Sequence, residues 1–370
     1  MKAFNKYTFL ALAGLAILSS SCSDSDSGPK SEYDREAMLV NYADNLIVPG
    51  YQQFKTETEE MNTAISAFTA NPTVSSLTAA RKEYLDAYKV WQDVSVYEFG
   101  PADAQMLRSN LNIYPTTTSK IESNISSGTY NLQLTENFSA KGFPAIDYLL
   151  YSNASDADVV ALYTSDANAA KRKKYLQDIT TLVKQGVDAT ASAWISGNYA
   201  QTFKTSTGTA VGSAVSNMVN GLNGDIDITK RAKVGIPSGR FSVGTPQPDK
   251  AEAFYSKSSL ELLKRAVLAE KAIFQGMTPA GTNGPGLDDY LDHVGAKYNN
   301  GTLSSAIVAQ FDAALAAINA LQNPISQAVN SNPQGVSKVY EELQKLIVLT
   351  KTDMPAALGV SITYTDNDGD

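Results

Sequence analysis

Apolar side chains recur at three- and four-residue steps through both halves of the chain, a spacing that places them on one face of an α-helix. The first half has two such stripes: Leu77, Ala80, Tyr84, Ala87, Tyr88, Trp91 and Val94, and Tyr175, Ile179, Leu182, Gly186, Ala189 and Ala193. The second half has two more: Leu303, Ile307, Phe311, Leu315, Ile318 and Leu321, and Val339, Leu343, Leu346 and Thr350. No regular alternating series predicts a sheet, so we expect an all-α protein.

Helix-breaking residues separate these stripes. They are the clusters Asn71-Pro72, Gly100-Pro101, Gly276 to Gly286, Asn323-Pro324 and Asn332-Pro333. Without its N-terminal segments the chain keeps roughly 340 residues, more than one hydrophobic core usually spans. We therefore predict two antiparallel helical bundles, at residues 33–205 and 206–370.

The first 32 residues predict export and attachment to a membrane. Lys2 and Lys6 precede an apolar run from Phe9 to Leu18, which is too short to cross a bilayer but has the length of a secretory signal. Cys22 is the only cysteine, and its position resembles the bacterial lipoprotein box, in which the cysteine carries lipid and becomes the mature N-terminus. We expect a signal peptide at 1–21 and an acidic Ser/Asp tether at 22–32. The alternative is a plain signal peptide with an incidental cysteine.

These features predict a cell-envelope lipoprotein that lipid on Cys22 anchors in the outer membrane. The acidic stretch after Cys22 is similar to surface-export signals of Bacteroidetes lipoproteins, and both the periplasmic face and the cell surface remain open. Loss of the signal removes two lysines, so the formal charge goes from -8 to 28 minus 38, or -10. Nucleic acid is not an expected partner, because its phosphates are bound by Lys and Arg.

A set of landmarks along the mature chain resembles the imelysin-like proteins. Residues 142–147, Gly-Phe-Pro-Ala-Ile-Asp, are similar to the family signature of glycine, any residue, histidine, two residues and glutamate. The other landmarks are Trp91 with Phe99-Gly100-Pro101, Arg108, Ile113-Tyr114-Pro115, Lys233 to Pro237, Tyr255 to Leu260, and Leu358 to Thr363 with the acidic end Asp366 to Asp370. The resemblance implies two similar antiparallel four-helix-bundle domains with a functional site in the cleft between them. It also implies a part in iron uptake, although such proteins were once grouped as metallopeptidases.

The signature lacks its histidine in this chain. Pro144 stands in that place and Asp147 in the place of glutamate, and His293 is the only histidine in the sequence. Zinc catalysis needs several imidazole, thiolate or carboxylate ligands around an open coordination position. We therefore do not expect an enzyme.

Asp147 has two interpretations at this stage. It lies one helical turn after Pro144, which suits a first turn, so its carboxylate would stabilise the N-terminal end of its own helix. Alternatively Asp147 is a site carboxylate and a metal ligand, since ferric iron favours oxygen donors.

Other residues are candidates for the same cleft. Arg108 and Lys233 would bind an anionic ligand such as an iron chelate, or would form internal ion pairs. Ser256 and Ser259 would offer hydroxyl groups, or would cap a helix start. The tyrosines near the landmarks, among them Tyr114 and Tyr255, are predicted in the core with their hydroxyl groups at its rim, or lining the cleft.

The sequence thus predicts a lipoprotein of iron uptake that binds iron or an iron-chelate-like anionic ligand at the domain interface. Iron-transport components are its expected partners. Two alternatives stay open, a metallopeptidase of the imelysin type and a surface interaction module without catalysis.

Overall fold

Helices make up nearly all the regular structure of residues 32–153 and 155–364, the parts of the chain that the computed structural model describes. Cys22, the predicted signal peptide, most of the predicted tether and the acidic end after residue 364 lie outside the described residues. The predicted all-α class is confirmed, because the strands found in the described part are two residues long each.

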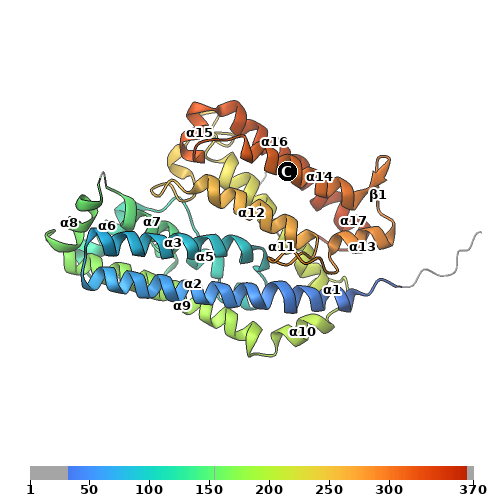
Figure 1. Cartoon of the computed structure of the whole chain (residues 1–370), viewed down its shortest axis with the longest axis horizontal. Helices are drawn as coiled ribbons and strands as arrows, with labels where there is room; N and C mark the ends of the chain where they lie inside the picture. Colours follow the sequence, from blue (N-terminus) through green and yellow to red (C-terminus); the bar gives the residue numbers. More distant parts are fainter. Residues whose placement is uncertain (1–31, 154, 365–370) are drawn as a thin grey trace, which may run out of the picture. The chain divides into compact units, whose positions relative to one another are not determined.

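The first half of the chain, residues 33–205, contains the long helices α2, α3 and α9 (Figure 1). Its elements are α1 (Arg35–Asn41), the π-helix η1 (Tyr42–Ile47), α2 (Val48–Ala70), α3 (Val74–Val94), the 3₁₀-helix η2 (Ser95–Tyr97), α4 (Pro101–Ala104), α5 (Leu107–Leu111), α6 (Thr118–Ser127), the 3₁₀-helix η3 (Thr135–Ala140), α7 (Gly142–Tyr151), α8 (Asp156–Thr164), α9 (Ala169–Ile195) and α10 (Tyr199–Thr205).

The second half, from residue 206 on, is built around α11, α12, α14 and α16. Its elements are α11 (Ala214–Ile228), the π-helix η4 (Thr229–Gly235), the 3₁₀-helix η5 (Pro248–Lys250), α12 (Ser259–Phe274), α13 (Leu287–Val294), β1 (Lys297–Tyr298), β2 (Gly301–Thr302), α14 (Leu303–Asn319), α15 (Ile325–Ser331), α16 (Pro333–Val348), the π-helix η6 (Leu349–Asp353) and α17 (Met354–Leu358). The two strands pair antiparallel, with Lys297 opposite Thr302.

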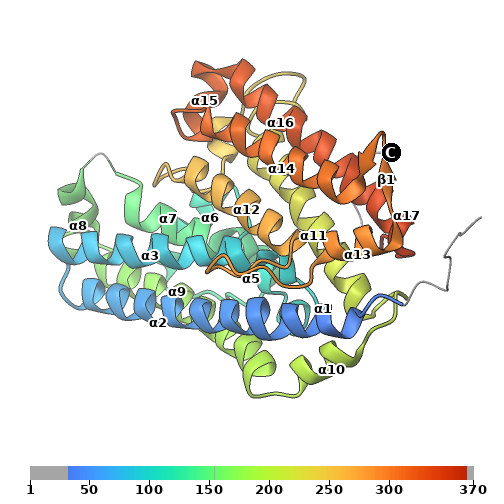
Figure 2. The ribbon, with the colours of Figure 1, turned by 45° about the vertical axis from the view of Figure 1, so that its right-hand side comes forward.

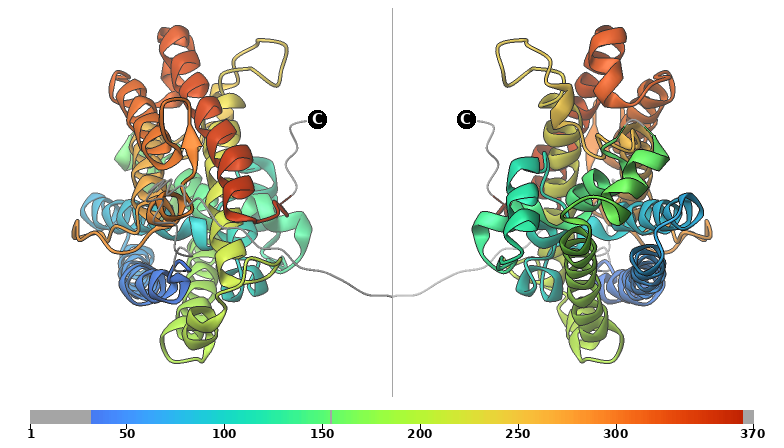
Figure 3. Two further views of the ribbon diagram at one scale, coloured as in Figure 1. Left: turned by 90° about the vertical axis from the view of Figure 1, so that its right-hand side faces the viewer. Right: turned by 90° about the vertical axis from the view of Figure 1, so that its left-hand side faces the viewer.

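The long helices pack in two groups that meet at α3. α2 packs against α3 and α9, while α12 packs against α14, which in turn packs against α16 (Figures 1 and 2). The link between the groups is the contact of α12 with α3, and α11 also contacts η2. End-on, α10 and the pair α15 and α16 lie at opposite extremes (Figure 3). We call the zone where the two halves touch the seam.

The predicted division into two domains at residues 205 and 206 stays a prediction, since the described residues from Tyr33 on belong to one compact unit. Among the described helices, none combines the length and the apolar character that crossing a membrane requires.

Three of the four predicted stripes are buried as expected. All seven residues of the stripe from Leu77 to Val94 are buried, and the stripes of α14 and α16 are buried as well. The predicted buried face of α9 is wrong after Ile179. The buried residues that follow are Val183, Val187 and Trp194, while Ala189 is exposed. Val187 and Trp194 bury more apolar area than Gly186, Ala189 and Ala193 would, so they set which face turns inward in the C-terminal half of α9.

Candidate functional site

One face of α3 carries polar groups into the seam. Tyr84, Tyr88, Gln92 and Ser95 follow one another at steps of four, four and three residues, so they share that face, and all four are buried. Tyr88 and Gln92 hydrogen-bond across the seam to Glu252, and Ser95 does so to Asp225. Tyr84 instead bonds to Asp147 of the first half.

Lys233 forms a buried ion pair on this face. Its Nζ lies 2.5 Å from Glu252 Oε2 and 2.7 Å from Gln92 Oε1. The other carboxylate oxygen of Glu252 accepts hydrogen bonds from the Tyr88 hydroxyl at 3.1 Å and from Asn112 Nδ2 at 2.9 Å. Lys233 stands in the π-helix η4, and such segments often mark functional positions.

Arg108, in α5, forms a second pair across the seam. One guanidinium nitrogen lies 2.6 Å from Asp225 Oδ1 and 2.6 Å from the carbonyl oxygen of Ser95. The guanidinium group also lies 5.3 Å from the centre of the Trp91 ring. Since Arg108 and Lys233 are both bound to carboxylates, the structure favours the interpretation as internal ion pairs over a cationic site for an anion.

Glu270 of α12 is a neighbour of Asp225 and is fully buried. Its Oε1 accepts a hydrogen bond from Thr229 Oγ1 at 2.7 Å, while Oε2 has no partner other than Asp225. Burial and the negative charge of Asp225 raise the pKa of Glu270 well above its ordinary value. Protonation of Glu270 removes the repulsion between its carboxylate and that of Asp225.

Asp147 lies in α7 and is buried, but its carboxylate does not serve its own helix. Oδ1 accepts from the Tyr84 hydroxyl at 3.1 Å, and the two oxygens accept from the backbone N–H groups of Tyr255 at 2.8 Å and Ser256 at 3.1 Å. The expected role at the start of α7 is therefore wrong, because Asp147 is not in the first turn of α7 and donors from α3 and from the second half bind its carboxylate. Burial raises the pKa of Asp147 to about 6, although these hydrogen bonds act against the rise.

Gly142 opens α7 directly against α5. Its φ is +73°, and an added Cβ would lie 2.2 Å from the carbonyl oxygen of Leu111. Only glycine fits this close approach. Pro144 follows in the first turn of α7, as expected.

The side chains of the remaining predicted residues near Asp147 have separate partners. The hydroxyl of Tyr114 is buried and has no hydrogen-bond partner among the described residues. The Tyr255 ring packs edge-on against Tyr148, with ring centres 5.2 Å apart. Ser256 Oγ donates to the carbonyl oxygen of Ala253 at 3.4 Å.

Ser259 does not cap its own helix, contrary to one of the two expectations. The residue at the N-cap of α12 is Ser258, whose side chain makes no capping hydrogen bond. Ser259 Oγ instead accepts from the backbone N–H of Ile325 at 2.9 Å. It thus supports the first residue of α15, because α15 begins beside the first turn of α12.

Several spaces along the seam are lined by residues of both halves. We call one of them, of about 390 Å³, the seam pocket, and its lining residues are Ser95, Glu98, Phe99, Arg108, Asn217, Asn220, Gly221, Gly224, Asp225, Asp227, Ile228, Thr363 and Tyr364. Another, of about 20 Å³, lies beside Tyr114, Pro144, Asp147 and Tyr255 and has room for about one water molecule. Among the predicted site residues, Arg108 lines the seam pocket, and Lys233, Ser256 and Ser259 line neither this pocket nor the smaller space.

Several residues of the seam pocket were missed at the sequence level. Asp225 and Asp227 are the charged residues of helix α11, which was the available signal. Asp227 pairs with buried Lys230 at 2.9 Å. Glu98 accepts from the backbone N–H of Arg108 at 2.9 Å, and burial raises its pKa.

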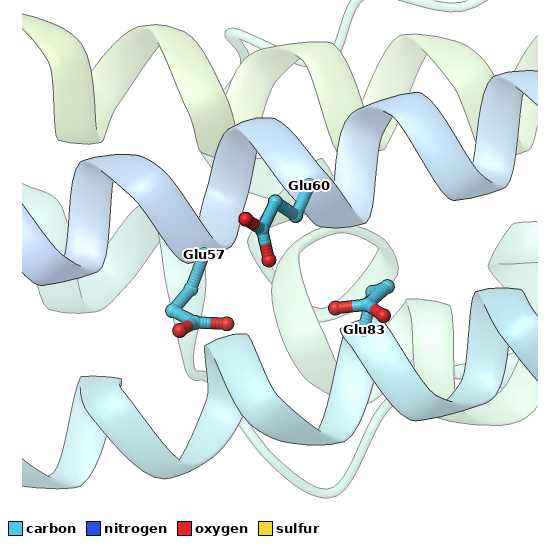
Figure 4. A group of neighbouring side chains, drawn as sticks. All are labelled: Glu57, Glu60 and Glu83. Carbon is cyan, nitrogen blue, oxygen red and sulfur yellow. The ribbon is translucent and has the colours of Figure 1, made fainter.

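A cluster of three carboxylates was also missed. Glu57, Glu60 and Glu83 offer oxygens that all lie within 4.8 Å of one another, on the facing surfaces of α2 and α3 (Figure 4). Among the described residues, 32–153 and 155–364, no other group of three or more acidic, histidine or cysteine side chains lies close enough together to hold one metal ion. Glu60 is exposed, whereas Glu57 and Glu83 are half-buried.

The residues at the motif do not fit a zinc centre. Pro144 has no ligand atom, and both oxygens of Asp147 already accept hydrogen bonds. His293 lies in α13, where its ring is 5.4 Å from that of Tyr33. No nitrogen ligand is therefore available beside Asp147.

Comparisons with known proteins agree on one family. The family model described as Imelysin (peptidase M75) matches residues 47–352. Iron-regulated protein A of Synechococcus elongatus is 23% identical over 333 residues, covering 88% of this chain and 85% of the relative.

Two solved structures share the fold. The crystal structure of a protein assigned as an iron-regulated protein A precursor, from Parabacteroides distasonis, has a TM-score of 0.74 at 19% identity and covers 90% of this chain and 97% of its own. An imelysin-like protein from Psychrobacter arcticum has a TM-score of 0.62 at 16% identity, with 89% and 97% covered. At these identities the likeness establishes the fold alone.

Proposed function

The chain belongs to the imelysin family, and on this basis we propose that it is a binding protein of iron acquisition in the cell envelope. The name of its relative, iron-regulated protein A, supports the link to iron. The predicted signal and lipid attachment at Cys22 support the envelope location and anchorage in the outer membrane.

The observation that carries the proposal is the seam pocket. Its volume of about 390 Å³ falls in the range of small-molecule sites, and residues of both halves line it. The carboxylates of Glu98, Asp225 and Asp227 and the amides of Asn217 and Asn220 supply polar groups to a lining that also contains Phe99 and Ile228. Such a lining suits a small ligand that has both polar and apolar surface.

The proposed ligand is iron held by a small chelator. Ferric iron favours oxygen ligands, but the carboxylates of the seam pocket do not form a group close enough to hold a bare ion among the described residues. An anionic chelate is disfavoured, because Arg108 is already paired with Asp225. A neutral or cationic iron complex fits this lining better.

The metallopeptidase alternative lacks support at the motif, where the residues do not fit a zinc centre. It predicts cleavage of a protein substrate by the pure protein, with loss of that cleavage on adding a chelator. The interaction-module alternative predicts that no iron compound binds.

Gly224 offers a test of the seam pocket. A Cβ at this position lies 3.8 Å from the nearest atom outside its own helix turn, in the Tyr364 ring, so Gly224→Ala is tolerated, while the longer side chain of Gly224→Leu extends into the pocket. Binding would be measured by calorimetry with ferric citrate, ferric acetohydroxamate and, under anaerobic conditions, ferrous sulfate.

We expect the wild type and Gly224→Ala to bind one of the iron complexes, and Gly224→Leu to bind it at least about tenfold more weakly, a loss of about 1.4 kcal/mol. Equal binding by Gly224→Leu would place the ligand elsewhere. Absence of binding to all three probes would refute the proposed function.

The predicted location has its own test. Cys22→Ala removes the atom that carries lipid, so the protein is expected to move from the membrane fraction to the soluble envelope fraction. Retention of the variant in the membrane fraction would contradict lipid anchorage.

A further inference from the structure

A short segment of the second half is bound to the first half by two buried carboxylates. We call residues 251–257, between η5 and α12, the strap. Glu252 of the strap accepts hydrogen bonds from Tyr88 and Asn112 of the first half. Asp147 of the first half in turn accepts from backbone N–H groups of the strap.

The strap presents its N–H groups as an anion site. The consecutive N–H groups of Tyr255 and Ser256 both point at the Asp147 carboxylate, at 2.8 and 3.1 Å. They lie between Ala253 and Lys257, which have φ values of +49° and +62°. Successive N–H groups around left-handed residues form the concave sites that bind anions in many proteins.

The backbone conformation of the strap has a cost that the carboxylate offsets. Non-glycine residues in the left-handed region persist where the surroundings hold them, and neither Ala253 nor Lys257 is a glycine. The Tyr84 hydroxyl supplies a third donor at 3.1 Å. A side chain that is 1% exposed thus has three donors from two other elements.

We propose that the strap is a carboxylate-binding site that the chain's own Asp147 fills, and that this contact clamps the two halves together at the seam. The position that carries the family's acidic motif residue is then a fixed interdomain contact in this chain. The space beside Pro144, of about 20 Å³, leaves no volume for an additional ligand there.

The test removes the carboxylate and supplies another one. Asp147→Ala leaves two N–H groups and one hydroxyl buried without partners, which is expected to lower the melting temperature by about 5 °C. Formate is small enough to replace the missing group. Added formate should restore part of the loss, with a saturable dependence on its concentration.

Matched controls separate site binding from general salt effects. Sodium chloride at the same ionic strength should not restore Asp147→Ala. Asp156→Ala removes a half-exposed carboxylate that pairs with Arg81, and formate should not affect it. Equal effects of formate on Asp147→Ala, Asp156→Ala and the wild type would overturn the proposal.

Hydrogen exchange keeps the test open if Asp147→Ala does not fold. In the wild type, the amides of Tyr255 and Ser256 should exchange as slowly as those of α3. Tyr84→Phe removes one donor to the carboxylate and should speed exchange at both amides while α9 keeps its rates. Fast exchange of the two amides in the wild type, or no change in Tyr84→Phe, would contradict the clamp.

Discussion

Replacing Glu270 with glutamine is expected to remove a strong dependence of stability on pH. The native-state pKa of Glu270 is raised well above 4.5, first by burial and then by the charge of Asp225, while Lys233 acts in the opposite direction. The native protein therefore holds a proton that the unfolded chain releases above pH 4.5. The stability from this proton is fully present below pH 4.5 and is lost as the pH rises through the native pKa.

The size of the effect follows from proton linkage. Each pH unit changes the free energy of unfolding by about 1.36 kcal/mol when one state is protonated and the other is not. With an unfolded pKa of 4.5 and a native Glu270 that stays protonated, the loss between pH 5 and pH 7 is about 2.5 kcal/mol. For roughly 330 ordered residues this corresponds to about 4 °C in melting temperature.

Glutamine keeps the shape and the neutral charge of a protonated Glu270. Its carbonyl oxygen can accept from Thr229, and its amide can donate to Asp225. Glu270→Gln is therefore expected to match the wild type at pH 5 and to exceed it by about 2.5 kcal/mol at pH 7.

The assay is urea unfolding of both proteins at pH 5, 6 and 7. Glu342→Gln is the matched control, since Lys338, Gln310 and Lys345 hold the pKa of Glu342 at about 2. Stability from Glu342 is present above pH 4.5 and is lost as the pH falls toward 2, so this variant should keep the wild-type slope between pH 5 and 7. Equal slopes for Glu270→Gln and the wild type would refute the reasoning.

Two further predictions concern contacts across elements. Ser259→Ala removes the acceptor for the Ile325 N–H and should cost about 1 kcal/mol in urea unfolding; an unchanged midpoint would show that water replaces the hydroxyl. Gly142→Ala places a Cβ 2.2 Å from the Leu111 carbonyl oxygen at a φ of +73° and should lower the free energy of unfolding by about 3 kcal/mol, whereas a loss below about 1 kcal/mol would mean that α5 moves aside freely.

Local patterns predicted much of the helical structure. The stripe from Leu77 to Val94 corresponds to α3, and the breaks at Asn71 and Asn332 fall at helix ends. These features depend on side-chain spacing within a few turns and on residues that end helices, so they are visible without the fold. The buried face of α9 could not be predicted in this way. The helix has apolar residues on more than one face, and packing against α2 selects between them.

The candidate site was predicted only in part. The landmarks included Arg108, Lys233, Asp147, Tyr255 and Ser256, but they did not include Asp225 and Glu252, the partners of Arg108 and Lys233, nor show that Asp147 binds the backbone of Tyr255 and Ser256. Whether a charge is paired depends on which helices meet.

The sequence by itself determined the helical class and the positions of most long helices. It also determined which ligand residues are missing, namely a second cysteine and a histidine at the motif. The tertiary structure alone decided that the charges of the seam neutralise one another, that Glu270 is buried beside Asp225, and that Asp147 serves the strap. The physical reason is that helix formation follows from neighbours along the chain, whereas burial and ion pairing follow from residues that the fold brings together.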